Sequence, residues 1–133
     1  MTDVRVCKDL GEIQHLWRQY WPQQCLFDFW PVRAAFQRQF QHDPHFLVAE
    51  RQGDVCGMLA LSWIDEEHYF GHFPGELWHG KTWLEQNRVL AEDEAAFEAL
   101  WEAVPDVAQV RYLHPDSYMP TGASITVDEV GYL

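Results

Sequence analysis

The sequence predicts a single α/β (α+β) domain of 133 residues, in which helices flank a mixed, mostly antiparallel sheet. Two apolar runs, 46–49 and 55–64, are each about as long as a strand, and the charged segment 50–54, which holds one glycine, separates them. This pattern is typical of an antiparallel hairpin. Because both runs are almost continuously apolar, we expect the hairpin to be covered on both faces.

A strand and a helix are expected at the amino terminus. Residues 4–7 alternate as in a short strand, and Asp9 precedes Glu12 by the spacing of a helix-capping box. Residues recurring on one helical face then predict a buried stripe of Ile13, Leu16, Trp17 and Tyr20. The Trp21-Pro22 pair is expected to end this helix.

A second helix is expected after a loop over residues 22–29. Pro31 suits the first turn of that helix, and 42–44 end it. Its buried stripe is predicted to consist of Val32, Phe36 and Phe40. We expect most of the surrounding aromatic residues to be core rather than a ligand-stacking box: Trp17, Tyr20, Trp21, Phe27, Phe29 and Trp30.

More sheet and one helix are expected after the hairpin. A third strand is predicted over 67–73, whereas 75–90 has no clear pattern. Glu92, Asp93 and Glu94 favour the start of a helix that Pro105 ends. Its inward face is predicted to be Phe97, Leu100, Trp101 and Val104. Two further strands are expected over 107–113 and 125–133.

Charge and composition exclude several classes of function. The net charge of −12 argues against nucleic acid or an anionic membrane as partner, because both require a positive field. No apolar run approaches the length of a membrane span, so a cytoplasmic protein is expected. The three cysteines Cys7, Cys25 and Cys56 form no C-x-x-C pair and are interpreted as small buried side chains in a reducing compartment.

The order strand, helix, helix, hairpin, strand, helix, strand resembles that of the GNAT acyltransferase fold. The hairpin FLVAERQGDVCGMLAL and the segment HFPGELWHGKTWLEQNRVL at 72–90 carry the resemblance, which covers most of the chain. The second segment is similar to the amino-terminal half of tandem GNAT (FemABX-like) proteins. This resemblance implies an acyl-CoA N-acyltransferase-like domain, possible N-acetyltransferase activity and a second GNAT-like domain as partner.

The pyrophosphate grip that the resemblance implies is missing from the sequence. Active GNAT domains carry a motif similar to Q/R-x-x-G-x-G/A at the start of a helix, where backbone N–H groups hold the pyrophosphate of coenzyme A. No G-x-G occurs in this chain, and the corresponding helix starts behind three acidic residues. We therefore expect no cofactor of its own, with acetyl-CoA bound only through a second domain. The chain alone is expected to be inactive.

A nucleotide-binding pattern also occurs but is rejected. Residues 75–82 match G-x-x-x-x-G-K-[ST], and 125–129 resemble the Walker B strand that would accompany it. Bulky Trp78 and His79 do not suit a nest of backbone amides, and too little chain follows for a doubly wound sheet. A P-loop nucleotide binder therefore remains only a minor alternative function.

The candidate ligand-binding residues lie in the same region. Three polar residues with different hydrogen-bonding groups follow an aromatic-rich loop where open sheets tend to bind ligands. The residues singled out are Trp78, His79, Trp83, Glu85, Asn87 and Arg88. The alternative interpretation is a solvated helix face or loop. No residue presents itself as catalytic.

The histidines form two close pairs, His42 with His45 and His68 with His72. A metal pair on one strand is geometrically possible for the second pair. No third ligand comes at a characteristic spacing, so no metal site is predicted, and a surface-facing polar row is the preferred interpretation.

Two functions are carried forward. In one, this half shapes the acceptor site or the dimer while a second GNAT copy binds acyl-CoA; in the other, it is a non-catalytic binding or assembly module. The apolar residues Ile125, Val127 and Val130 lie in a final segment that ends with Tyr132-Leu133, as though the domain were incomplete at its carboxyl end. A homodimer through residues 123–133, and through the strand at 107–113, is therefore expected. A continuing reading frame with a G-x-G would favour the first function.

Overall fold

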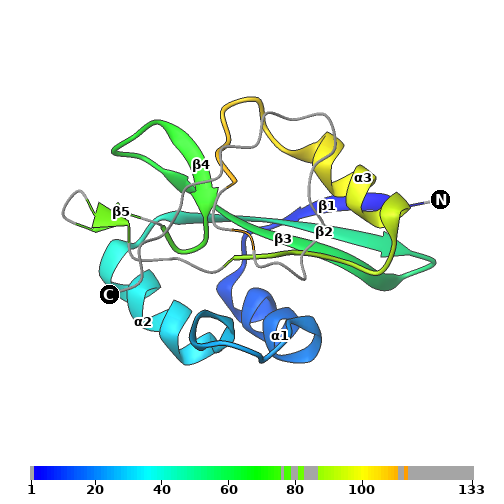
Figure 1. Cartoon of the computed structure of the whole chain (residues 1–133), viewed down its shortest axis with the longest axis horizontal. Coiled ribbons are helices and arrows are strands. Elements are labelled where there is room, and N and C mark those ends of the chain that lie inside the picture. Colours follow the sequence, from blue (N-terminus) through cyan, green and yellow to red (C-terminus); the bar gives the residue numbers. More distant parts are fainter. Residues whose placement is uncertain (1, 76, 79–80, 83–86, 111–112, 114–133) are drawn as a thin grey trace.

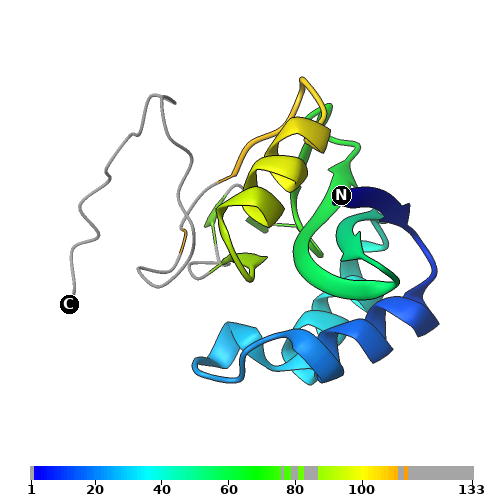
Figure 2. The same cartoon turned by 90° about the vertical axis from the view of Figure 1, so that its right-hand side faces the viewer.

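The computed structural model describes residues 2–75, 77–78, 81–82, 87–110 and 113 (Figure 1). A mostly antiparallel sheet of five strands runs through the molecule in the order β1-β2-β3-β4, and β7 pairs with β3 beside β4. Helices α1 and α2 lie on one side of this sheet and α3 lies on the other, as two perpendicular views show (Figures 1 and 2). The predicted fold class, α and β with a mostly antiparallel sheet, is thus confirmed.

The hairpin of β2 (Asp43–Arg51) and β3 (Asp54–Ile64) is the centre of the sheet. It is longer than expected, because the pairing extends from Asp43 opposite Trp63 to Arg51 opposite Asp54. Gln52 and Gly53 form the turn with φ angles of 51° and 84°. Two consecutive positive φ angles are typical of the type I′ turn, whose twist matches that of the strands. On the other side of β2, β1 (Asp3–Cys7) pairs antiparallel, as predicted.

Both faces of the hairpin are covered, as predicted. Neighbouring residues of β2 point to opposite faces, so Phe46 and Val48 pack with the helices α1 and α2. Leu47 and Ala49 pack into a second cluster with α3. A cluster of buried apolar side chains therefore makes a core on each side, and the two cores share the hairpin.

Helix α1 (Leu10–Tyr20) begins and ends where the sequence indicates. The Asp9 side chain accepts a hydrogen bond from the Glu12 N–H at 3.1 Å, which satisfies one of the amides that a helix start leaves without a partner. Its buried face holds three of the four predicted residues, Ile13, Leu16 and Trp17. The loop after it contains a short 3-10 helix, η1 (Leu26–Asp28).

Helix α2 (Trp30–Phe40) has Pro31 in its first turn, but its predicted apolar stripe was wrong. The buried residues are Trp30, Arg33 and Gln37, whereas Val32, Phe36 and Phe40 are only half-buried. The helix is rotated relative to its apolar pattern because Arg33 finds hydrogen-bond acceptors in the core. Phe29, predicted to be core, is 44% exposed.

The segment after the hairpin differs most from expectation. Strand β4 (Tyr69–His72) starts later than predicted because residues 65–68 form a turn. The unpatterned segment contains a two-stranded ladder of β5 (Leu77–Trp78) and β6 (Lys81–Thr82). It also contains β7 (Val89–Ala91), which was not predicted and which pairs with residues 57–59 of β3.

Helix α3 (Glu94–Ala103) confirms the predicted helix, with Phe97 and Leu100 buried and Trp101 and Val104 partly buried. After it, Ala108 bridges Phe70 and Leu113 bridges Asn87, both in parallel. Over 107–110 the chain is thus attached to the sheet by a bridge rather than by a continuous strand. The predicted strand at 125–133 lies outside the described residues. In the described part of the chain, no helix is long and apolar enough to cross a membrane.

Candidate functional site

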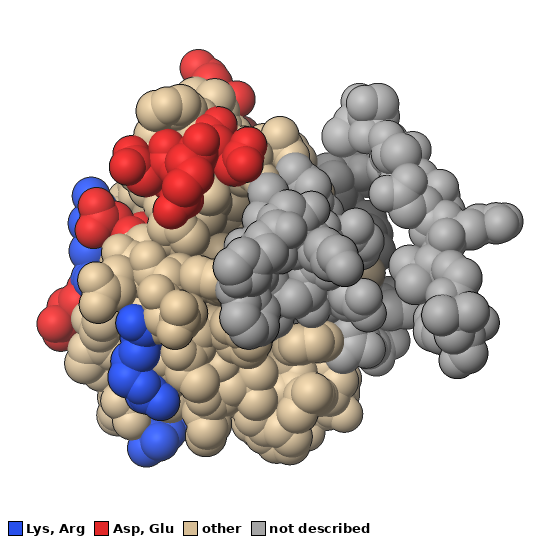
Figure 3. Space-filling view, turned by 90° about the vertical axis from the view of Figure 1, so that its left-hand side faces the viewer, with Lys and Arg blue, Asp and Glu red and all other residues tan. Residues whose placement is uncertain are grey.

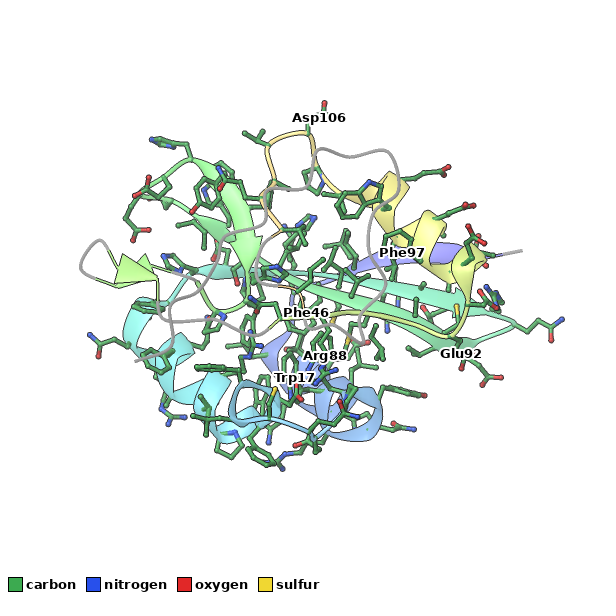
Figure 4. All side chains as sticks on the ribbon, viewed as in Figure 1. Trp17, Phe46, Arg88, Glu92, Phe97 and Asp106 are labelled. Carbon is green, nitrogen blue, oxygen red and sulfur yellow. The ribbon has the colours of Figure 1, made fainter. Side chains whose placement is uncertain are left out.

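Two of the predicted site residues, Asn87 and Arg88, lie in the core beneath the sheet. Their exposed fractions are 1% and 5%. Together with Asp28 and Arg33 they form a buried polar cluster between the helical layer and the segment that leads into β7. Figure 4 shows Arg88 close to Trp17 on the helical side of the sheet, with Phe97 on the opposite side. The interpretation of these two residues as a solvated surface is therefore wrong.

An ion pair between Arg88 and Asp28 is the centre of the cluster. Arg88 donates from Nε to Oδ1 at 2.8 Å and from Nη2 to Oδ2 at 2.6 Å. The backbone N–H groups of Gln24 and Cys25 donate to Oδ2, and Trp21 Nε1 donates to Oδ1. The carboxylate, only 1% exposed, thus has a donor on every side, as a buried charge requires.

The electrostatic effect on Asp28 has two opposing parts. Burial acts to raise the pKa of its carboxyl group, but the hydrogen bonds from Arg88, Cys25 and Gln24 outweigh it. The net result holds the Asp28 pKa well below its usual range. Asp28 is therefore ionised at neutral pH and serves as the anion that fixes Arg88.

Arg33 is the second buried cation of the cluster, at 1% exposed. Its Nε donates to the Phe27 carbonyl and its Nη1 donates to the Phe73 carbonyl, both at 2.6 Å. Nη1 also lies 3.2 Å from Asn87 Oδ1. The guanidinium carbon lies 5.1 Å from the centre of the Trp17 ring, a cation–π distance. Arg33 thereby ties α2 to both the end of β4 and the start of β7.

Trp17, Trp21 and Trp30 are buried beside the cluster, which confirms the prediction that these three are core. Trp17 and Trp21 stack with ring centres 4.2 Å apart, and Trp30 stacks on Phe73 at 5.8 Å. Trp17 Nε1 donates to the Asp28 carbonyl at 2.7 Å. Each indole of the stacked pair thus combines apolar contact with one hydrogen bond into the cluster.

Cys25 borders the cluster and is half-buried, whereas Cys7 and Cys56 are buried as predicted. Its Sγ donates to Asp28 Oδ2 at 3.2 Å. Burial and the neighbouring Asp28 raise the pKa of the Cys25 thiol. A raised pKa keeps the sulfur protonated at neutral pH, which is unfavourable for nucleophilic chemistry.

The remaining predicted site residues are those whose side chains the structure does not describe. Trp83, Glu85 and His79 lie outside the described residues, and Trp78 is described only through its backbone in β5. That these residues bind a ligand stays a prediction.

Sequence reasoning missed Asp28 and Arg33. Asp28 is the acidic residue of the aromatic-rich stretch 26–30, and Arg33 interrupts the apolar pattern of α2. Charged residues in such apolar surroundings were the available signal, because a charge placed among aromatic side chains needs a buried partner.

The P-loop alternative does not fit the backbone. Lys81 and Thr82 form β6 and pair with Leu77 and Trp78. In a P-loop the corresponding Lys and Ser/Thr open a helix behind a phosphate-binding turn. A strand at this position offers no such helix start.

The predicted surface row of histidines is wrong for His72 and His42, which are buried, whereas His45 is half-buried and His68 is exposed. His72 is 1% exposed, and His42 is 8% exposed. The His42 ring bridges the Pro74 carbonyl and Glu66 Oε2, both at 2.8 Å. Among the described residues, no three His, Cys, Asp or Glu side chains gather closely enough to hold a metal ion.

The start of α3 is the position at which the GNAT resemblance would place a phosphate-binding motif. Asp93 caps this helix by accepting from the Ala96 N–H at 2.9 Å, and its carboxylate also pairs with Arg51. The Arg51 hydrogen bonds lower the pKa of Asp93 to about 2. The helix start is thus already occupied by the Asp93 carboxylate, which Arg51 holds in place.

The described residues therefore present a buried polar cluster that fixes α2, η1 and β7, and a helix start that is capped by an acid. Comparison of the chain with known proteins found no matching family model, no matching curated protein and no matching solved structure.

Proposed function

We propose that the chain is an acyl-CoA N-acyltransferase-like (GNAT-like) domain that lacks a coenzyme A grip and shapes the acceptor site or the dimer for a second such domain. The order β1, α1, α2, β2, β3, β4 and the antiparallel order of the sheet support this proposal. Helices on both faces of the central hairpin support it further.

The observation that supports the lack of a coenzyme A site is that an acidic residue caps the start of α3. A pyrophosphate at a helix start needs backbone N–H groups that are free to donate, together with the positive end of the helix dipole. At α3 the Ala96 N–H already donates to Asp93, and Glu92 and Glu94 add negative charge beside it. A phosphate approaching this position would be repelled.

Calorimetric titration of the protein with acetyl-CoA and with longer acyl-CoAs tests the proposal. We expect no dissociation constant tighter than about 100 μM, which corresponds to about 5.5 kcal/mol. Titrations at low and at moderate salt separate a weak charge effect from a specific grip. A low-micromolar constant at both salt concentrations would show that the grip is present.

The alternative, a non-catalytic binding or assembly module, is favoured by the internal use of Asn87 and Arg88. Both were candidates for ligand contact, yet Arg88 is paired with Asp28 and Asn87 contacts Arg33. In either function we propose that the chain pairs with a second GNAT-like domain or with a copy of itself. The two functions differ in one measurable respect. If this chain shapes the acceptor site, acyl transfer by a second domain requires this chain; if it is a non-catalytic module, acyl transfer does not require it.

A further inference from the structure

A groove of about 540 Å³ opens where α1 begins, α2 ends and β2 begins. Its charged lining residues are the basic Lys8 and Arg38 and the acidic Asp9 and Asp43, and the acceptor Gln37 and the apolar Leu10 and Pro44 also border it. The groove is open to solvent, so a ligand bound there would remain partly exposed. We propose that the groove binds a small zwitterion of the amino-acid or dipeptide class, with its carboxylate at Lys8 and Arg38 and its ammonium group at Asp43 and Gln37.

Gln37 gives the groove an acceptor that is not yet used. The side chain is 9% exposed, and its Nε2 donates to the His42 carbonyl at 2.8 Å. Its Oε1 is buried and has no hydrogen-bond partner among the described residues. Buried acceptors almost always have a donor, so this atom marks a position where a ligand N–H group gains a hydrogen bond.

Lys8 and Arg38 supply positive charge that is not used elsewhere. Several other cations of the described chain are committed to carboxylates, among them Arg51 to Asp93 and Arg88 to Asp28. Lys8 and Arg38 are exposed and form no ion pair within the described residues. Figure 3 shows basic side chains along the left edge and in the lower part of this side of the molecule, while acidic side chains gather in its upper part and also lie at the left edge. In a chain of net charge −12, an anionic group is best received at such a position.

Asp43 makes a zwitterion a better ligand than a simple anion. It is exposed and forms no ion pair among the described residues, and it lines the same groove as the two cations. A simple anion would meet repulsion from Asp43, and a simple cation would meet repulsion from Lys8 and Arg38. A molecule with both charges satisfies both sides, and Leu10 and Pro44 offer apolar contact to a small side chain.

The test compares four probes by NMR titration of the isotope-labelled protein: the dipeptide Ala-Ala, alanine, propionate and propylamine. We expect Ala-Ala to shift the amide signals of residues 37–44 in a saturable way. Propionate and propylamine, which each lack one charge, should bind roughly tenfold more weakly or worse. Alanine decides whether a single residue is long enough to reach both sides.

Three variants identify the contacts. Arg38→Gln and Asp43→Asn should each weaken Ala-Ala binding by roughly tenfold, because each removes one charged partner. Arg18→Gln is the matched control, since Arg18 is an exposed arginine of α1 that does not line the groove, and it should leave the affinity unchanged. The urea midpoint of each variant separates loss of binding from loss of folding.

Several results would overturn the inference. The first is the absence of a saturable shift with Ala-Ala or alanine up to about 20 mM, a dissociation constant that corresponds to about 2.3 kcal/mol. The second is propionate binding as tightly as Ala-Ala. The third is an unchanged affinity for Ala-Ala in both Arg38→Gln and Asp43→Asn when these variants are folded. The groove contains neither Asn87 nor Arg88, so this inference does not rest on the proposed function, and coenzyme A titration leaves it untouched.

Discussion

At the residue scale, Arg88 and Asp28 depend on each other because both are almost excluded from water. We predict that Arg88→Leu lowers the free energy of unfolding by about 3–5 kcal/mol, since it leaves the Asp28 carboxylate buried without its cation. Urea denaturation measures the change. Arg38→Leu is the matched control, because this exposed arginine forms no ion pair among the described residues and should change stability by about 0.5 kcal/mol or less.

The double variant Asp28→Leu/Arg88→Leu distinguishes the loss of a partner from the loss of packing. It removes both charges, so its cost should be well below the sum of the two single changes. If the three free energies were simply additive, the interpretation of Asp28 and Arg88 as a coupled pair would be wrong.

The same pair predicts how stability depends on acid. The Asp28 pKa is lower in the folded protein than in the unfolded chain, where it is about 3.9. The stabilisation from its ionised form is therefore fully present well above that value and is lost as pH falls below it. Urea denaturation at a series of acidic pH values should show a fall in stability that is smaller in Arg88→Leu. Equal slopes in both proteins would contradict the assignment.

At the scale of elements, the hairpin turn fixes how β2 and β3 pair. Gly53 has a φ angle of 84°, and an added Cβ would meet nothing within 4 Å. The cost of Gly53→Ala therefore comes from backbone conformation alone, and we predict a loss of about 1–2 kcal/mol in unfolding free energy.

Gly11→Ala is the matched control for that prediction. Gly11 lies in the first turn of α1, where an added Cβ would have only ordinary contact with Asp9 Oδ2 at 3.5 Å. Alanine suits a helix better than glycine, so a gain of about 0.5–1 kcal/mol is expected there. Thermal and urea denaturation of both variants should give changes of opposite sign. Unchanged or increased stability of Gly53→Ala would argue against a turn that requires positive φ.

At the scale of the whole molecule, assembly is the main open prediction. The expected homodimer uses residues 123–133, which lie outside the described part of the chain, together with 107–113. Light scattering coupled to size exclusion, over a wide dilution range, should give twice the monomer mass. Val127→Lys places a charge in the proposed interface and should shift the protein toward the monomer. A monomer mass at high micromolar concentration in the unaltered protein would rule the dimer out.

The elements that could be read from the sequence are those that short-range interactions define. The Asp9 cap, the Gln52-Gly53 turn and the helix that follows Asp93 each depend on residues within about five positions of one another. Local patterns also gave the two-sided burial of the hairpin, because a nearly continuous apolar strand has no polar face to expose. The fold class follows from these elements and their order.

What only the tertiary structure decided are the contacts between distant residues. Arg33 reaches the Phe73 carbonyl 40 positions away and Asn87 54 positions away, which turns a polar side of α2 inward. Arg88 finds Asp28 across 60 positions. Strand β7 has three residues, too few for a period to appear, and exists because β3 offers it a free edge. A charge is recognisable in a sequence, but whether it is buried depends on which partner the folded chain places beside it.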